Sequence, residues 1–165
     1  MSKDIAIINY GMGNLRSVEN ALAKVGSKPR IVSSPDEVGE TAGLVLPGVG
    51  ALEDCVDGLR TSGFGDFVKG WIREDRPFLG VCLGLQALFD VSEERDVRGL
   101  GVFAGKVVRF KSKPGLKIPH MGWNMAQLKQ SVSPFWKGLD EADDRFYFVH
   151  SYYACPEDPS LVLTT

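Results

Sequence analysis

One cysteine stands where the sequence could hold a nucleophile. Cys82 lies between Gly80 and Gly84 in the segment GVCLG, after an apolar run and before a helix-like run. This G-x-C-x-G pattern is typical of a nucleophile elbow, a strained turn that presents a reactive side chain at the end of a strand. The flanking glycines would relieve clashes with neighbouring elements. N–H groups of the following helix would favour the thiolate, and the Leu83 N–H could stabilise an oxyanion.

A second segment could supply the other half of such an oxyanion site. The sequence PGVG at residues 47–50 follows an apolar run, and Gly48 and Gly50 would let the backbone turn its N–H groups inward. In a parallel α/β sheet the ligand site lies at the carboxyl ends of the strands, where both segments fall. Taken alone, PGVG is better interpreted as a simple glycine-rich turn. Beside the cysteine segment, we expect it to share one site.

Strand-like and helix-like runs alternate through roughly the first half of the chain. We predict strands at residues 5–9, 29–32, 43–46 and 77–81, and helices at 15–25, 51–59, 64–74 and 83–89. This alternation predicts an α/β fold with a mostly parallel central sheet and helices on both faces. Later strand-like runs without helices between them predict an antiparallel extension, at 102–110, 125–128, 145–149 and 161–163. We find no repeat or linker, so residues 1–165 are expected to form a single domain.

Composition excludes several classes of function. The formal net charge of −2, with no basic block, argues against non-specific nucleic-acid binding. No apolar run approaches the roughly 18–20 residues that span a bilayer, and the N-terminus lacks the pattern of a signal peptide. Cys55, Cys82 and Cys155 form no CxxC pair, and we expect neither a metal nor a cofactor. This cysteine usage suits a reducing cytoplasm, and we predict that Cys55 and Cys155 are buried in the core.

Motifs spread over nearly the whole chain point to a family. The segment GVCLGLQ (80–86) resembles the signature of the class I glutamine amidotransferases. Within that class, the other motifs resemble the glutaminase subunits of imidazole glycerol phosphate synthases, which serve histidine biosynthesis. These motifs are NYGMGN (9–14), LPGVGA (46–51), PHMGWN (119–124) and YFVHSYY (147–153). The resemblance implies a glutamine amidotransferase fold.

The resemblance also implies roles for particular residues. Cys82 would attack the side-chain carbonyl of glutamine, form a glutamyl thioester and release ammonia. The N–H of Leu83, with the backbone near Val49 and Gly50, would form the oxyanion hole. Gln86 follows Cys82 by four residues, so both can share one helix face. The positions that would contact the substrate glutamine are Gln86, Glu94, Ser151 and Tyr152.

A partner is implied as well. In the family, the ammonia passes to a cyclase subunit with a (β/α)8 barrel fold, and the two subunits form a heterodimer. The positions that match this interface are Asn14, Trp123, Asn124 and Tyr147. An aromatic anchor beside a hydrogen-bonding amide suits an interface. Without the resemblance, Asn14 is interpreted as a helix N-cap and Trp123 as a core residue.

The general base that such a cysteine needs is not assigned. The family supplies a His and a Glu from an F-H-P-E stretch, which this sequence does not contain. His150 lies in a different motif, and His120 suits a loop or interface, so neither is assigned as the base. We expect that the chain lacks the C-terminal part of its domain. Alternatives are another class I amidotransferase subunit, a redox sensor or chaperone-like protein with an elbow cysteine, and, less consistent with a cysteine, an esterase.

Overall fold

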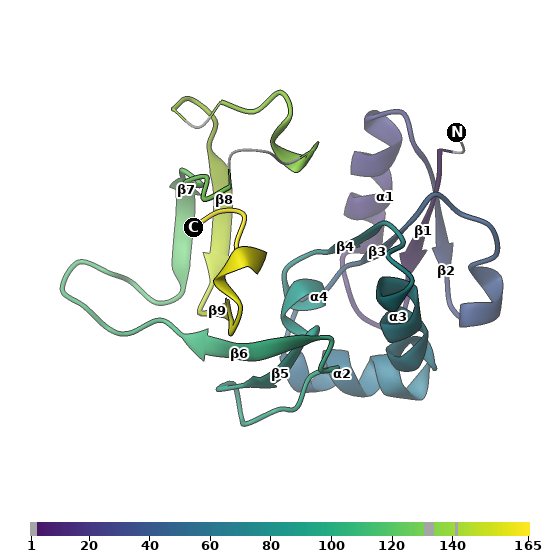
Figure 1. Ribbon diagram of the computed structural model, residues 1–165, viewed down its shortest axis with the longest axis horizontal. Coiled ribbons are helices and arrows are strands. Elements are labelled where there is room, and N and C mark those ends of the chain that lie inside the picture. The colour runs from purple at the N-terminus through teal and green to yellow at the C-terminus, as the bar shows by residue number, and fades with distance from the viewer. Residues whose placement is uncertain (1–2, 131–133, 141) are drawn as a thin grey trace.

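The computed structural model describes residues 3–130, 134–140 and 142–165. A four-stranded parallel sheet lies at the centre of its first half, with the order β2-β1-β3-β4 (Figure 1). Its strands are β1 (Asp4–Ile8), β2 (Lys28–Val32), β3 (Gly43–Leu46) and β4 (Phe78–Gly80). The predicted α/β fold with a mostly parallel central sheet is confirmed, and each of these strands lies within two residues of its predicted bounds.

The strand order decides which helix covers which face. From β1 the chain crosses through α1 (Leu15–Lys24) to β2 on one side. From β3 it crosses in the opposite direction, through α2 (Leu52–Thr61) and α3 (Phe64–Arg73), to β4. Right-handed crossovers that lead in opposite directions put their helices on opposite faces. The sheet is therefore covered on both faces, as predicted.

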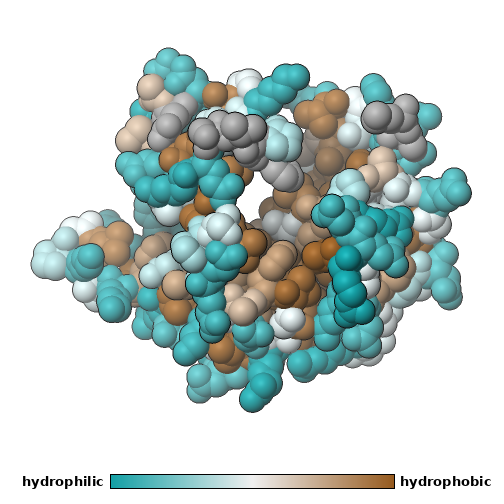
Figure 2. All heavy atoms as spheres, in the orientation of Figure 1, coloured by the Kyte–Doolittle hydropathy of each residue, from teal (hydrophilic) through white to brown (hydrophobic). Residues whose placement is uncertain are grey.

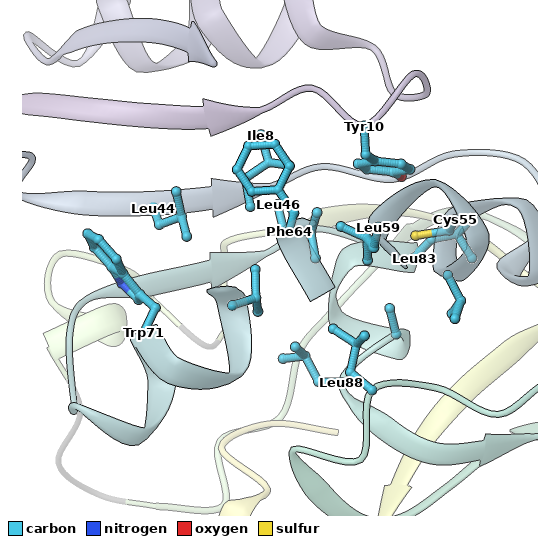
Figure 3. Packing of buried hydrophobic residues seen from close by; sticks show 14 of the residues in the cluster. Ile8, Tyr10, Leu44, Leu46, Cys55, Leu59, Phe64, Trp71, Leu83 and Leu88 are labelled. Carbon is cyan, nitrogen blue, oxygen red and sulfur yellow. The ribbon is translucent and has the colours of Figure 1, made fainter. Parts of the chain in front are cut away.

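The main core fills the space between the sheet and the pair α2 and α3 (Figure 3). Alternate residues of β1 and β3 point into it, as expected for the two-residue period of a strand. Its fully buried members include Ala6, Ile8, Leu44, Leu46, Leu52, Cys55, Val56, Leu59, Phe64 and Val68. The strand order reverses between β1 and β3, so the loops that follow these two strands meet at the usual position of a ligand site.

The second half of the chain forms smaller sheets beside the first (Figure 1). One sheet has the order β5-β6-β9, with β6 antiparallel to β9, and another pairs β7 with β8 antiparallel. The bounds are β5 (Phe89–Ser92), β6 (Phe103–Arg109), β7 (His120–Asn124), β8 (Phe146–His150) and β9 (Tyr152–Pro156). Figure 2 shows an opening in this face of the molecule with hydrophobic residues on its walls. The described residues include no helix that is long and apolar enough to cross a membrane.

Several predicted elements were wrong in this half. The strand predicted at 125–128 was wrong in position. The strand in this region is β7, whose backbone pairs with β8 over His120–Asn124. Leu128 makes only an isolated bridge to Thr164. The run at 161–163 overlaps the 3-10 helix η3 (Pro159–Leu161), and β9 was not predicted. Two further 3-10 helices are η1 (Pro35–Glu37) and η2 (Pro134–Trp136).

The helix predicted at 83–89 is also shorter than expected. The helix α4 spans only Leu83–Gln86. The Leu88 N–H already donates three residues back, to the Leu85 carbonyl oxygen (3.2 Å), rather than four as in an α-helix. The carbonyl oxygens of Ala87 and Leu88 accept hydrogen bonds from the N–H groups of Leu100 (2.7 Å) and Val102 (2.8 Å). A nearby loop thus ends the helix, and the chain enters β5 directly. One helical turn also carries a smaller dipole than the predicted helix would.

The start of α4 packs directly against the backbone at the end of β3. A Cβ atom on Gly84 would lie 1.9 Å from the Leu46 carbonyl oxygen, and one on Gly80 would lie 2.7 Å from the Gly84 carbonyl oxygen. Neither neighbour is a flexible side-chain end that could move aside. These two positions therefore require glycine for steric reasons.

We predict that Gly84→Ala lowers the free energy of unfolding by about 3 kcal/mol, because the new methyl group overlaps the backbone of β3. Gly70→Ala is the matched control, since a Cβ at this position in α3 would meet nothing within 4 Å. The control is expected to gain about 0.5–1 kcal/mol from helix propensity. Urea denaturation measures both changes, and equal stability of the two variants would contradict the steric account.

Candidate active site

Cys82 occupies a strained turn between β4 and α4. Its backbone has φ 55° and ψ −112°, a region that residues with a side chain rarely adopt, and its side chain is exposed. The turn is held on one side by a hydrogen bond from the Val81 N–H to the Leu46 carbonyl oxygen (2.9 Å). On the other side, the Leu85 N–H donates to the Cys82 carbonyl oxygen (3.0 Å). The geometry is the elbow that the glycine spacing predicted.

The loop at residues 47–50 lies directly against this elbow. A Cβ atom on Gly48 would lie 2.6 Å from Leu83 Cβ and 2.8 Å from the Gly84 nitrogen. The two segments singled out in the sequence are therefore neighbours in the fold. Gly50 has a φ of +94°, which glycine adopts without strain.

The predicted oxyanion donors have no hydrogen-bond partners in the part of the chain that the structure describes. Among the described residues, no hydrogen bond is found from the N–H groups of Val49, Gly50 or Leu83. Val49 is itself exposed. These N–H groups are thus available to a ligand beside Cys82, although their role in catalysis stays a prediction.

Glu94 lies beside Leu52, close to where the loop 47–50 ends. Its carboxylate oxygen Oε2 accepts a hydrogen bond from the Leu52 N–H (3.1 Å), the first residue of α2. The backbone N–H of Glu94 is held in turn by the Ser92 hydroxyl (3.0 Å), and Ser92 is buried. The half-buried Glu94 carboxylate therefore caps α2, and its predicted contact with substrate stays a prediction.

Gln86 and Tyr152 are brought together from distant parts of the chain. Gln86 is buried, and its Nε2 donates to the Tyr152 carbonyl oxygen (3.2 Å) in β9. The same oxygen lies 2.9 Å from Nδ1 of His150. The backbone of Ser151 pairs instead with Phe110, whose N–H donates to the Ser151 carbonyl oxygen (3.0 Å). Three of the predicted substrate residues thus gather where α4 meets β9.

The predicted interface aromatics form a cross-strand pair. Trp123 of β7 lies opposite Tyr147 of β8, with ring centroids 5.5 Å apart, and the Trp123 side chain is 71% exposed. The alternative of a core tryptophan is therefore wrong. Met121 and Val149 form the next exposed pair on the same face, because residues two apart along a strand share a face. We name these four residues the hairpin patch. The two-residue spacing of Met121 and Trp123 along β7 could have revealed Met121 from the sequence.

The two predicted asparagines serve local structure as well. The Asn14 side chain accepts a hydrogen bond from the Ser17 N–H (3.4 Å), which makes it the N-cap of α1. The Asn124 side-chain oxygen accepts from the Met125 N–H (2.9 Å). Both side chains are exposed, and contacts with a partner stay a prediction for both.

The histidines belong to an aromatic cluster on the hairpin of β7 and β8. His120 and His150 face each other across the strands, with ring centroids 5.8 Å apart. The Phe110 ring lies 4.9 Å from that of His150. Within the described residues, no hydrogen bond joins either histidine to Cys82. The described part of the chain also holds no group of three metal-ligating side chains.

Tyr10 and Cys55 are site neighbours that the sequence reasoning did not assign. The hydroxyl of Tyr10 donates to the Pro47 carbonyl oxygen (3.0 Å) at the start of the loop. Cys55 is buried, as predicted, and burial raises the pKa of its thiol to about 11. Cys155 is exposed, so its prediction as a core residue was wrong. Burial alternates along β9, and Cys155 falls on the exposed side.

Comparison with known proteins places the chain among enzymes of one class. Residues 6–164 match the family described as glutamine amidotransferase class-I. The imidazole glycerol phosphate synthase subunit HisH of Thermosynechococcus vestitus is 52% identical over 161 residues, covering 98% of this chain and 77% of that protein. The protein of the same name from Syntrophotalea carbinolica is 48% identical over 170 residues, covering 98% of this chain and 80% of the other.

Solved structures share the fold at low sequence identity. The structure of PurLQS from Thermotoga maritima superposes with a TM-score of 0.73 and 18% identity, covering 99% of this chain and 74% of that chain. A crystal structure of a glutamine amidotransferase superposes with a TM-score of 0.67 and 18% identity, covering 89% and 71%. At this identity the likeness concerns the fold alone.

We predict that the three thiols differ in reactivity according to their burial. A maleimide at neutral pH should label the exposed Cys82 and Cys155 readily. Cys55 should react at least about 100-fold more slowly, because its thiol must wait for an opening of the structure. Peptide mapping by mass spectrometry measures each site. Labelling of Cys55 as fast as Cys155 would contradict the packing described here.

Proposed function

The chain belongs to the class I glutamine amidotransferases, and we propose that it is the glutaminase subunit of an imidazole glycerol phosphate synthase. The proposal is carried by one observation, the exposed Cys82 on a strained elbow with the loop 47–50 packed against it. The proteins named for this synthase subunit match 98% of the chain, which favours this function over that of another class I subunit.

The reaction begins with attack by the sulfur of Cys82 on the side-chain amide carbon of glutamine. The carbonyl oxygen becomes an oxyanion, which the N–H groups of Leu83 and of the Val49–Gly50 segment stabilise. The C–N bond then breaks, ammonia leaves with an added proton, and a thioester remains on Cys82. Water hydrolyses the thioester to glutamate and restores the thiol. None of the described residues is assigned as the base that accepts the thiol proton.

The substrate glutamine is bound between the elbow and β9. Gln86, Ser151 and Tyr152 line one side of this site, at the contact of α4 with β9. Glu94 lies on the other side, at the start of α2, where its negative charge suits the ammonium group of an amino acid. One carboxylate oxygen holds the Leu52 N–H, which leaves the second oxygen for the substrate.

The ammonia is delivered to a cyclase subunit, which we propose to be a (β/α)8 barrel bound at the hairpin patch in a heterodimer. Exposed Trp and Tyr side chains are common anchors of protein interfaces, and the patch places both beside Met121 and Val149. We also propose that Asn14 and Asn124, whose side chains are both exposed, contribute hydrogen bonds to the partner. We also propose that the protein works in the cytoplasm, because its three cysteines are unpaired in the structure.

We predict that Cys82→Ala lowers glutamine hydrolysis in the complex with the cyclase on the order of 10⁴-fold or more, because the nucleophile is lost. The dissociation constant of the complex should stay within about 2-fold, since the hairpin patch does not include Cys82. Cys155→Ala, which removes the other exposed thiol, is the matched control and should keep full activity. Undiminished turnover by Cys82→Ala would refute the proposed nucleophile.

The redox-sensor alternative is tested with the same proteins. Peroxide treatment that oxidises Cys82 stoichiometrically, in a wild-type complex that never turns over glutamine, would favour a sensor over a glutaminase. Inactivation by peroxide of a complex that does turn over glutamine is the result we expect.

We predict that Trp123→Ala raises the dissociation constant of the complex by about 30-fold, because a large exposed anchor is removed from the interface. Val25→Ala, an equally exposed position at the end of α1, should leave the affinity unchanged. Titration calorimetry with the cyclase measures both. An unaltered affinity for Trp123→Ala would show that the partner binds elsewhere.

A further inference from the structure

Tyr10 connects the end of β1 to the loop that lies over the elbow. Its hydroxyl donates a buried hydrogen bond (3.0 Å) to the carbonyl oxygen of Pro47, which is the first residue of the loop 47–50. Figure 3 shows Tyr10 above Cys55 at the end of the core, near Leu83. The contact joins residues that are 37 positions apart in the sequence.

The Tyr10 side chain is closely surrounded by its neighbours. It is only 6% exposed, and α2 passes close beside it. A Cβ atom on Gly58 of α2 would lie 2.7 Å from the Tyr10 carbonyl oxygen and 2.8 Å from its ring atom Cδ2. The fully buried Cys55 of α2 lies below the ring (Figure 3). The ring is therefore wedged between α2 and the loop.

The hydroxyl also keeps its proton under physiological conditions. Burial raises the pKa of Tyr10 well above its ordinary value, and the nearby Cys55 thiol and Cys82 act in the same direction. A phenol carries a single proton, and here it is directed to the Pro47 oxygen. Pro47 is itself buried, so its oxygen depends on this protein donor rather than on water.

The two ends of the loop are held very differently. At one end, Pro47 has a fixed φ and a bonded carbonyl, and Gly48 packs on the elbow. At the other end, Val49 is exposed, and the N–H groups of Val49 and Gly50 are free among the described residues. Any displacement of Pro47 is passed on to these N–H groups, because one or two residues separate them from it.

We propose that Tyr10 is a positioning residue for the oxyanion site, holding the Pro47 carbonyl so that the Val49 and Gly50 N–H groups stay within reach of the atom attacked by Cys82. This inference rests on the proposed glutaminase function. Tyr10 does not touch the substrate. It acts through the backbone of the loop, and its effect should be felt when charge develops on the substrate oxygen rather than when glutamine binds.

The test is Tyr10→Phe, assayed for glutamine hydrolysis in the complex with the cyclase subunit. The change deletes only the hydroxyl. Removal of an oxyanion donor lowers kcat by about 10²–10³-fold, and a donor that is displaced rather than removed should cost less. We expect kcat to fall by about 10-fold, with KM for glutamine within about 2-fold of the wild-type value.

Two controls separate positioning from a general loss of structure. Tyr153→Phe makes the same chemical change at a half-exposed position in β9 and should keep the wild-type kcat. Alkylation of Cys82 by iodoacetamide passes through no oxyanion, so its rate should be the same in wild type and Tyr10→Phe. An unchanged kcat in Tyr10→Phe, or a fall in kcat matched by an altered alkylation rate, would overturn the inference. The natural full-length polypeptide is used in these assays, because none of the described residues is assigned as the base. A wild-type complex of that polypeptide that hydrolyses no glutamine would refute the proposed function itself.

Discussion

The close contact between the elbow and the end of β3 is the constraint on which the site depends. Leu46 presents its carbonyl oxygen to the Val81 N–H and leaves no room for a side chain on Gly84. Because α4 is pressed onto β3 in this way, the chain must turn sharply at Cys82, and the exposed thiol is the result. The loop 47–50, which continues from β3, packs across the first residues of α4.

The candidate site lies between two parts of the structure. One part belongs to the parallel central sheet and the other to the β5-β6-β9 sheet. The first part consists of three neighbouring strand ends of the parallel sheet, which supply Tyr10, the loop 47–50 and Cys82. The second part is β9, which belongs to the β5-β6-β9 sheet and reaches the elbow through the hydrogen bond of Gln86 to Tyr152. The nucleophile is thus positioned by the central sheet, while the proposed substrate contacts depend on how the two sheets sit together.

Local signals made part of this predictable from the sequence. Gly80 and Gly84 predicted the elbow, because the steric exclusion that requires them acts within a few residues. The alternation of strands and helices predicted the parallel sheet. The rest depends on contacts between distant segments. The end of α4 is set by the segment around Leu100, and β7 is set by its pairing with β8. The hydrogen bond of Tyr10 to Pro47 has no sequence signal, since a tyrosine after a strand is equally a core residue.

The separation between Gln86 and Tyr152 has a consequence for the order in which the protein is made. The central sheet, the elbow and the loop 47–50 lie within the first part of the chain to leave the ribosome. Gln86 finds its partner only after another 66 residues. At a synthesis rate of about 5–20 residues per second, the interval is on the order of 3–13 s. During it, a nascent chain can already present the Cys82 thiol before the part of the site formed by β9 exists, so each new molecule is open to oxidants and electrophiles earlier than it is open to catalysis.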